Sequence, residues 1–140
     1  MAQNSGRFGS LIGRILLSLI FVLAGFGKIG DWSATADYMA SRGMPAIPFF
    51  LTMTILVETV GGLSLLLGYR TKAAALALFL FLVPATLLFH NFWTYPEELQ
   101  KIQMIMFLKN LAIMGGLLTI AAAGPGPISL DARSNGGVRS

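Results

Sequence analysis

The segment ILVETVGGLSLLLG, residues 55–68, places a single carboxylate, Glu58, inside an apolar run that covers residues 46–68. If this run spans a membrane, burying an isolated Glu58 costs about 2.5 to 3.5 kcal/mol on the insertion scale. A charge of that kind persists where a partner offsets its desolvation. The segment therefore predicts a membrane-spanning helix and an ionisable partner elsewhere in the chain.

The composition is that of a membrane protein. Of the 140 residues, 55% are hydrophobic and 11% are charged, whereas soluble domains carry about 25% charged residues. The ten Lys and Arg residues lie scattered at the ends of apolar runs rather than in one stripe, which argues against nucleic acid as a partner. The chain has no cysteine, which excludes thiol exchange, iron–sulfur clusters and cysteine-ligated zinc within it.

Four apolar segments have the length that a helix needs to cross about 30 Å of hydrocarbon. They cover residues 10–29, 46–68, 73–92 and 102–123, and turn-forming stretches separate them. We therefore predict an all-α fold, a polytopic four-helix membrane bundle over residues 1–131, surrounded by the lipid bilayer. A mobile C-terminal tail is predicted for residues 132–140.

The positive charges predict the orientation of the bundle, because short cytoplasmic connections are enriched in Lys and Arg. With four spans, one side collects Arg7, Arg70, Lys72, Arg133 and Arg139, and the other holds fewer cations together with acidic residues. Both termini are therefore predicted to be cytoplasmic. Trp32, Trp93 and Tyr95 then lie at the outer interface, where aromatic side chains commonly anchor a membrane protein.

In this topology four ionisable residues share the outer half of the bundle: Lys28, Glu58, His90 and Lys109. Glu58 lies on one helical stripe with small residues, and Lys109 lies on another with Ala112, Ile113 and Gly116. Small residues let helices approach closely in lipid. We expect Glu58 to be paired, with Lys109 as the first candidate partner and Lys28 or His90 as the second.

Two interpretations of this polar layer stay open at this point. The charges could set the register of the helices, or they could form a functional site, and the crowding of four ionisable groups favours a site. A metal site is not predicted, because Glu58 and His90 lack the third and fourth ligands that zinc needs. No motif supports haem or another intrinsic cofactor.

Three stretches of the chain resemble the DoxX-like family. They are GRILLSLIFVLAGFGKIGDW (residues 13–32), VETVGGLSLLLGYRTKAAAL (57–76) and LKNLAIMGGLLTIAAAGPGPISLD (108–131), and His90 adds a fourth point of likeness. The resemblance extends over residues 12–131. It implies a four-helix protein of the bacterial inner membrane, from a family named for a small subunit of a thiosulfate:quinone oxidoreductase.

By this resemblance Lys28, Glu58, His90 and Lys109 occupy the family's polar positions, and Arg14 and Asp131 lie at the cytoplasmic edge. Arg14 and Asp131 are expected to form a structural ion pair, because the GPG turn at residues 124–126 could fold Asp131 back under the first helix. We do not expect thiosulfate, the substrate in the family's name, to be a substrate of this chain, because the chain has no cysteine and no soluble domain.

The expected function is that of a membrane subunit of a redox system, an oxidoreductase subunit that binds a quinone-like molecule in the polar layer. Glu58 and His90 are the candidate catalytic residues, and Lys28, Glu58, His90 and Lys109 the candidate binding residues. A protein partner would supply or accept the electrons. The alternatives are a non-catalytic subunit that docks or stabilises a larger complex, and a small carrier or proton pathway. Homo-oligomerisation is left open.

Overall fold

The computed structural model describes the backbone of residues 2–136 and the side chains of residues 6–134. Within this part of the chain every long element is an α-helix: α1 (Ala2–Gly30), α3 (Ile47–Leu67), α4 (Thr71–Phe89) and α5 (Glu97–Ala123). The segments Gly6–Gly30, Ile47–Leu67, Thr71–Thr94 and Glu97–Ala123 are long and apolar enough to cross a membrane. The prediction of an all-α protein with four membrane-spanning helices is confirmed.

Three short helices join or follow the long ones. Helix α2 (Trp32–Ser41) and the 3-10 helix η1 (Phe92–Thr94) lie in connections, and α6 (Leu130–Gly136) follows α5. The predicted spans 10–29 and 46–68 leave residues 32–41 in a connection, whereas the structure forms helix α2 there. Residues 132–136, the first part of the tail that the sequence predicts to be mobile, belong to α6, and residues 137–140 lie outside the described part.

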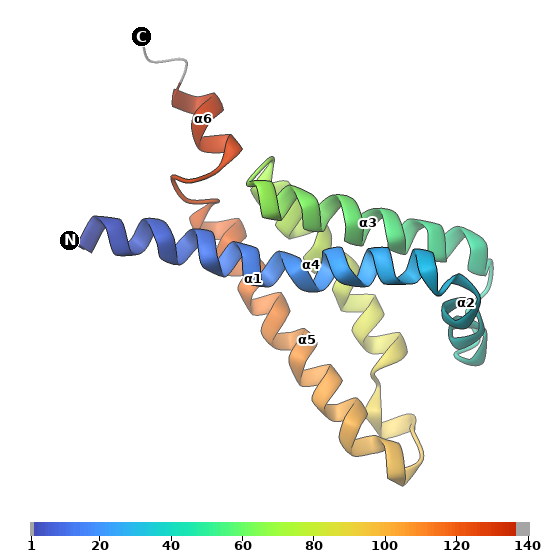
Figure 1. Ribbon diagram of the computed structural model, residues 1–140. Coiled ribbons are helices and arrows are strands. Elements are labelled where there is room, and N and C mark those ends of the chain that lie inside the picture. The colour runs from blue at the N-terminus through green and yellow to red at the C-terminus, as the bar shows by residue number, and fades with distance from the viewer. Residues whose placement is uncertain (1, 137–140) are drawn as a thin grey trace.

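The four long helices form two antiparallel hairpins (Figure 1). Helices α1 and α3 pack side by side along much of their length, and so do α4 and α5. The two hairpins meet near the chain termini and diverge toward α2 and η1 (Figure 1). Helix α3 also packs on α4, whereas α1 meets α5 over a much smaller area.

Small residues allow the α1–α3 hairpin to close. A Cβ atom on Gly62 would lie 2.9 Å from Val22 Cγ2, and one on Gly25 would overlap the Thr59 side chain. Side chains larger than hydrogen would push these helices apart, as is typical of tight helix contacts in membranes. The predicted contact stripe of α3 is confirmed, since Glu58, Gly62 and Leu65 are buried.

The hairpins share one apolar core where they meet. Its buried members come from all four long helices: Phe21, Leu65, Ala74, Ala75, Leu78, Leu82, Met114 and Leu117. The large apolar side chains outside this core are mostly exposed, as expected for helices whose outer faces contact lipid rather than water. The core joins the hairpins at one end and leaves the other end free to form a cavity.

Candidate functional site

Glu58 is paired with Lys28 within its own hairpin. Lys28 Nζ lies 2.7 Å from Glu58 Oε2, and the Lys28 ammonium also lies 3.5 Å from the carbonyl oxygen of Ala24. The Lys28 side chain is 25% exposed and that of Glu58 9% exposed. The expectation that Lys109 is the first partner of Glu58 is therefore wrong, and the second candidate, Lys28, is correct.

The rotation of α5 about its own axis differs from the prediction for Lys109 as the partner of Glu58. The face that α5 buries contains Asn110, Met114 and Leu117, so the predicted contact stripe through Lys109 and Ala112 is displaced by one residue, or about 100° of rotation. Lys109 Nζ contacts Met106 Sδ at 3.2 Å, and no carboxylate lies within salt-bridge distance of it among the described residues.

Asn110 is the polar residue that the sequence reading missed on α5. Its amide nitrogen donates to Thr86 Oγ1 at 3.0 Å, and Thr86 in turn donates to the carbonyl oxygen of Leu82 at 2.6 Å. Asn110 and Thr86 are both buried. An uncharged amide in the middle of an apolar span is the signal in the sequence that points to this contact.

His90 caps the end of α4 and is held by α5. Its backbone N–H donates to the carbonyl oxygen of Thr86 at 3.0 Å, and its Nδ1 lies 2.8 Å from Gln103 Oε1. This contact occupies one ring nitrogen and leaves Nε2 for another partner. His90 is thus fixed in position without being paired to Glu58.

Helix α2 bridges the two hairpins through side chains that cap α4. The Tyr38 and Tyr95 hydroxyls both donate to the carbonyl oxygen of Phe89, at 3.2 and 2.7 Å, and lie 3.0 Å from each other. Arg42 donates to the carbonyl oxygen of Leu88, and its guanidinium stacks 4.4 Å from the centroid of the Tyr95 ring. Cations and donors stabilise the carbonyl-rich end of a helix.

The environment of Tyr38 keeps its hydroxyl protonated. Burial, followed by the hydrogen bond to Tyr95, raises the pKa of Tyr38 to about 12. The phenol therefore acts as a neutral donor and acceptor at physiological pH.

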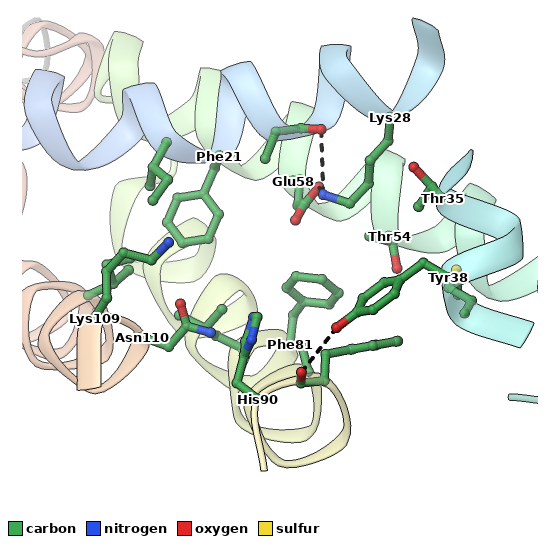
Figure 2. A pocket seen from close by; sticks show the side chains of 17 residues that line it. Phe21, Lys28, Thr35, Tyr38, Thr54, Glu58, Phe81, His90, Lys109 and Asn110 are labelled. Atoms are coloured by element: carbon green, nitrogen blue, oxygen red, sulfur yellow. Dashed lines mark hydrogen bonds and ion pairs between the residues drawn. The ribbon is translucent and has the colours of Figure 1, made fainter. Parts of the chain in front are cut away.

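A cavity of about 320 Å³ lies between the diverging hairpins and α2 (Figure 2). All four predicted binding residues line it, and the structure adds polar groups that the sequence reading did not select: Thr35, Tyr38, Thr54 and Asn110. Aromatic and aliphatic side chains make up most of the remaining wall, including Phe21, Phe81 and Phe89. The combination of an apolar wall with a few polar groups is typical of small-molecule sites.

The cavity has an asymmetric charge distribution. Figure 2 shows the Lys28–Glu58 pair on one side and the ammonium of Lys109 on another, directed into the space beside Phe21 and Asn110. Lys28 and Glu58 neutralise each other at 2.7 Å. Lys109 has no such neighbour among the described side chains, so it is the cation of the cavity whose charge is not balanced.

Arg14 and Asp131 lie together at the opposite end of the molecule but do not form the predicted ion pair. The Arg14 guanidinium donates to the carbonyl oxygens of Pro125 and Ile128. The Asp131 carboxylate accepts from the backbone N–H groups of Arg70 and Thr71, at 2.7 and 2.9 Å, and from the Thr71 hydroxyl at 2.8 Å. Carbonyl oxygens of the loop after α5 thus bind the Arg14 charge, and N–H groups at the start of α4 bind the Asp131 charge.

These contacts fasten the segment after α5 to the rest of the protein. Partial burial alone would raise the pKa of Asp131, but the hydrogen bonds from Thr71 and Arg70 and the nearby Arg14 charge outweigh it and lower the pKa. Asp131 also places a negative charge at the N-terminus of α4, where the helix dipole favours it. We interpret Arg14 and Asp131 as structural residues, separate from the cavity.

Comparison with known proteins places the chain among membrane proteins. A family model described as DoxX matches residues 9–91. The chain is 39% identical to the inner membrane protein YqjF of Escherichia coli and 33% identical to the inner membrane protein YphA of the same organism; in both cases the match covers 88% of this chain, and it covers 89% and 88% of those proteins.

A more distant relative is a Surfeit locus protein 4 homolog of Drosophila melanogaster. It is 31% identical over 94% of this chain, a match that covers 43% of that protein. No solved structure matches the chain significantly.

Proposed function

The chain belongs to the DoxX family, and from that premise we propose that it binds a quinone-like molecule in the cavity between its two hairpins, as the membrane subunit of a redox system. It is a multi-pass membrane protein whose bacterial relatives are named inner membrane proteins. The observation that carries the proposal is the convergence of Lys28, Glu58, His90 and Lys109 on one largely apolar cavity.

The chemistry of a quinone suits this wall. A quinone is a flat apolar ring with two carbonyl acceptors, so it needs aromatic contacts and hydrogen-bond donors. Phe21, Phe81 and Phe89 supply apolar contact, while Lys28, Lys109 and Asn110 carry donors, and His90 has Nε2 available. Donors placed where an oxygen gains negative charge favour its reduction.

Reduction of a quinone to a quinol takes up two electrons and two protons. In this proposal Glu58 and His90 each take up one proton from water at the membrane surface and pass it to a ligand oxygen, and a partner redox protein or soluble donor supplies both electrons. The carboxylate of Glu58 can serve in this way because Lys28 holds it at the cavity wall. The sequence has no motif for a cofactor that would store the electrons.

Filling the cavity tests the proposal. Ala85 lines the cavity on α4, so Ala85→Phe should place a ring in the ligand space and weaken the binding of naphthoquinone at least about tenfold, measured by titration of the purified protein in lipid nanodiscs. Ala77→Phe on the exposed face of the same helix is the matched control and should bind as the wild type does.

The same preparations separate this proposal from its alternatives. Equal binding by Ala85→Phe and Ala77→Phe, together with no quinone in organic extracts of the wild-type protein, would contradict it. A larger complex that co-purifies with both variants would then favour a non-catalytic docking subunit. Ion flux in liposomes that is lost in Glu58→Gln would favour a carrier.

A further inference from the structure

Among the side chains of residues 6–134, Lys109 is the charged group of the cavity for which no oppositely charged partner lies within salt-bridge distance. The ionisable groups that line the cavity are Lys28, Glu58, Tyr38, His90 and Lys109. Lys28 and Glu58 neutralise each other, Tyr38 is engaged with Phe89 and Tyr95, and His90 is engaged with Gln103. The polar contact of Lys109 within the described part of the chain is to the sulfur atom of Met106 at 3.2 Å, and a thioether sulfur is a weak acceptor that carries no charge.

The position of Lys109 along α5 limits what could neutralise it. Lys109 lies twelve residues after Glu97 and fourteen before Ala123, which corresponds to about 18 and 21 Å along the helix axis. The hydrocarbon core is about 30 Å thick, so Lys109 lies deep within it and far from the phosphates of either surface. A lipid headgroup at the interface is therefore a poor counter-ion, and a molecule inside the cavity is a better one.

We propose that Lys109 recognises an anion, so that the natural ligand is a compact, membrane-soluble acid whose negative charge is spread over a conjugated ring, as in a hydroxyquinone or a phenolate. This inference rests on the proposed function and specifies the ligand class for the same cavity. The ring packs against the aromatic wall, and the ionised oxygen accepts from Lys109 Nζ and from Asn110 on the same helix.

Charge spreading is the physical reason for this ligand class. Desolvating a compact carboxylate inside a membrane is far more costly than desolvating a delocalised anion, because the Born cost falls as the charge occupies a larger volume. The cavity is at the small end of the usual range for ligand sites. It therefore suits a fused ring system better than a long-chain acid.

Two probes of matched shape test the inference. The 2-hydroxy-1,4-naphthoquinone is a vinylogous acid and an anion at neutral pH, and unsubstituted 1,4-naphthoquinone is neutral, so a change in the ratio of their affinities between variants measures recognition of charge. We expect the wild-type protein in nanodiscs to prefer the anion, and the ratio of affinities to fall at least about tenfold in Lys109→Gln. Lys109→Arg should retain the preference, because it keeps the charge.

Lys101→Gln is the matched control. Lys101 is an exposed lysine on the same helix that does not line the cavity, so its loss changes the net charge equally and should leave the ratio as in the wild type. The two probes partition differently into lipid, but this difference is the same for every variant, so it cancels when the ratios of two variants are compared.

The outcomes distinguish this inference from the function on which it rests. One outcome is that naphthoquinone binds the wild type and loses affinity in Ala85→Phe, while the ratio of the two affinities in Lys109→Gln equals that of the wild type. In that case the cavity binds quinones, and anion recognition by Lys109 is wrong. If neither probe binds the wild type, both proposals fail. If the ratio of affinities falls as much in Lys101→Gln as in Lys109→Gln, the effect is due to net charge, and the proposed role of Lys109 is wrong.

Discussion

At the scale of single residues, buried charges in this protein are satisfied by the nearest available partner on a packed helix face. Glu58 and Lys28 belong to two helices that pack against each other along much of their length, and their atoms meet at 2.7 Å. Lys109 is on α5, which meets α1 over a much smaller area and lies across the cavity. Helix packing, rather than similarity of depth in the membrane, decided which cation neutralises Glu58.

Arg14 and Asp131 show the same rule outside the cavity. Each carries a full charge, yet each binds backbone groups: Arg14 binds carbonyl oxygens in the loop after α5, and Asp131 binds N–H groups at the start of α4. These charge-assisted hydrogen bonds are stronger than bonds between neutral groups. The C-terminal segment is consequently held to the α3–α4 turn, where Asp131 N–H also donates to the carbonyl oxygen of Gly68 at 2.9 Å.

Acid should release this segment. The pKa of Asp131 is lowered in the folded protein, so its stabilising effect is fully present above the unfolded value of about 3.9 and is lost as the pH falls through the lower folded value. We expect the amides of Arg70 and Thr71 to lose protection from hydrogen exchange in that range. Asp131→Asn should show weakened protection already at neutral pH and little further change in acid.

Protection of both amides that is unchanged across the acid range in the wild-type protein would contradict this account. The amide of Tyr69 provides an internal reference, because it donates to the carbonyl oxygen of Ser64 at 2.9 Å and has no bond to Asp131.

At the scale of helices, glycines fall into two classes that sequence alone does not separate. Gly25 and Gly62 face the opposite helix of their hairpin so closely that a Cβ atom would collide with it. Gly6, Gly9 and Gly13 on the same α1 have nothing within 4 Å of the place where a Cβ atom would lie. The first class shapes the hairpin, and the second has no packing role within the described chain.

Substitution by alanine should distinguish the two classes. Gly62→Ala should destabilise the folded protein by about 1 to 3 kcal/mol, because its methyl group would lie 2.9 Å from Val22 Cγ2. Gly13→Ala should be neutral or stabilising by up to about 1 kcal/mol, because alanine is the better helix former. Unfolding of both variants in mixed detergent micelles measures the difference, and equal stability would contradict the packing argument.

Helix α2 shows how a short element can matter to the site. The stretch WSATADYMAS lies between the predicted spans 10–29 and 46–68 and forms a ten-residue helix in the structure. Its Thr35, Tyr38 and Met39 nevertheless line the cavity. A tertiary role of this kind, closing a cavity and capping α4, leaves no periodic signal in the sequence.

At the scale of the whole molecule, the two hairpins are joined at one end and separated at the other (Figure 1). The end where they separate holds α2, η1 and the cavity, and the joined end holds the start of α1 and α6. If the distribution of Lys and Arg determines the insertion, the cavity lies in the outer half of the membrane and both termini are cytoplasmic.

The absence of native cysteine makes this orientation directly measurable. Single cysteines at the exposed positions Ser33 and Ser134 lie at opposite ends of the molecule. A membrane-impermeant maleimide applied to intact bacterial cells should label Ser33→Cys and not Ser134→Cys. A permeant reagent should label both, and the reverse pattern with the impermeant reagent would overturn the predicted orientation.

The sequence by itself determined the membrane environment, the four spans and the identity of four cavity residues, because the length and apolarity of a segment and the cost of burying a charge are properties of local sequence. The helices α1 and α5 begin before the predicted apolar spans, at Ala2 rather than residue 10 and at Glu97 rather than residue 102, because a helix continues past the apolar core. The α3 contact face was also predictable from its small residues.

Only the tertiary structure decided the pairing of Glu58 with Lys28, the isolation of Lys109, and the contributions of Tyr38 and Asn110 to the cavity. These features depend on the rotation of α5 and on the angle between the hairpins, which arise from side-chain packing across helices distant in the sequence.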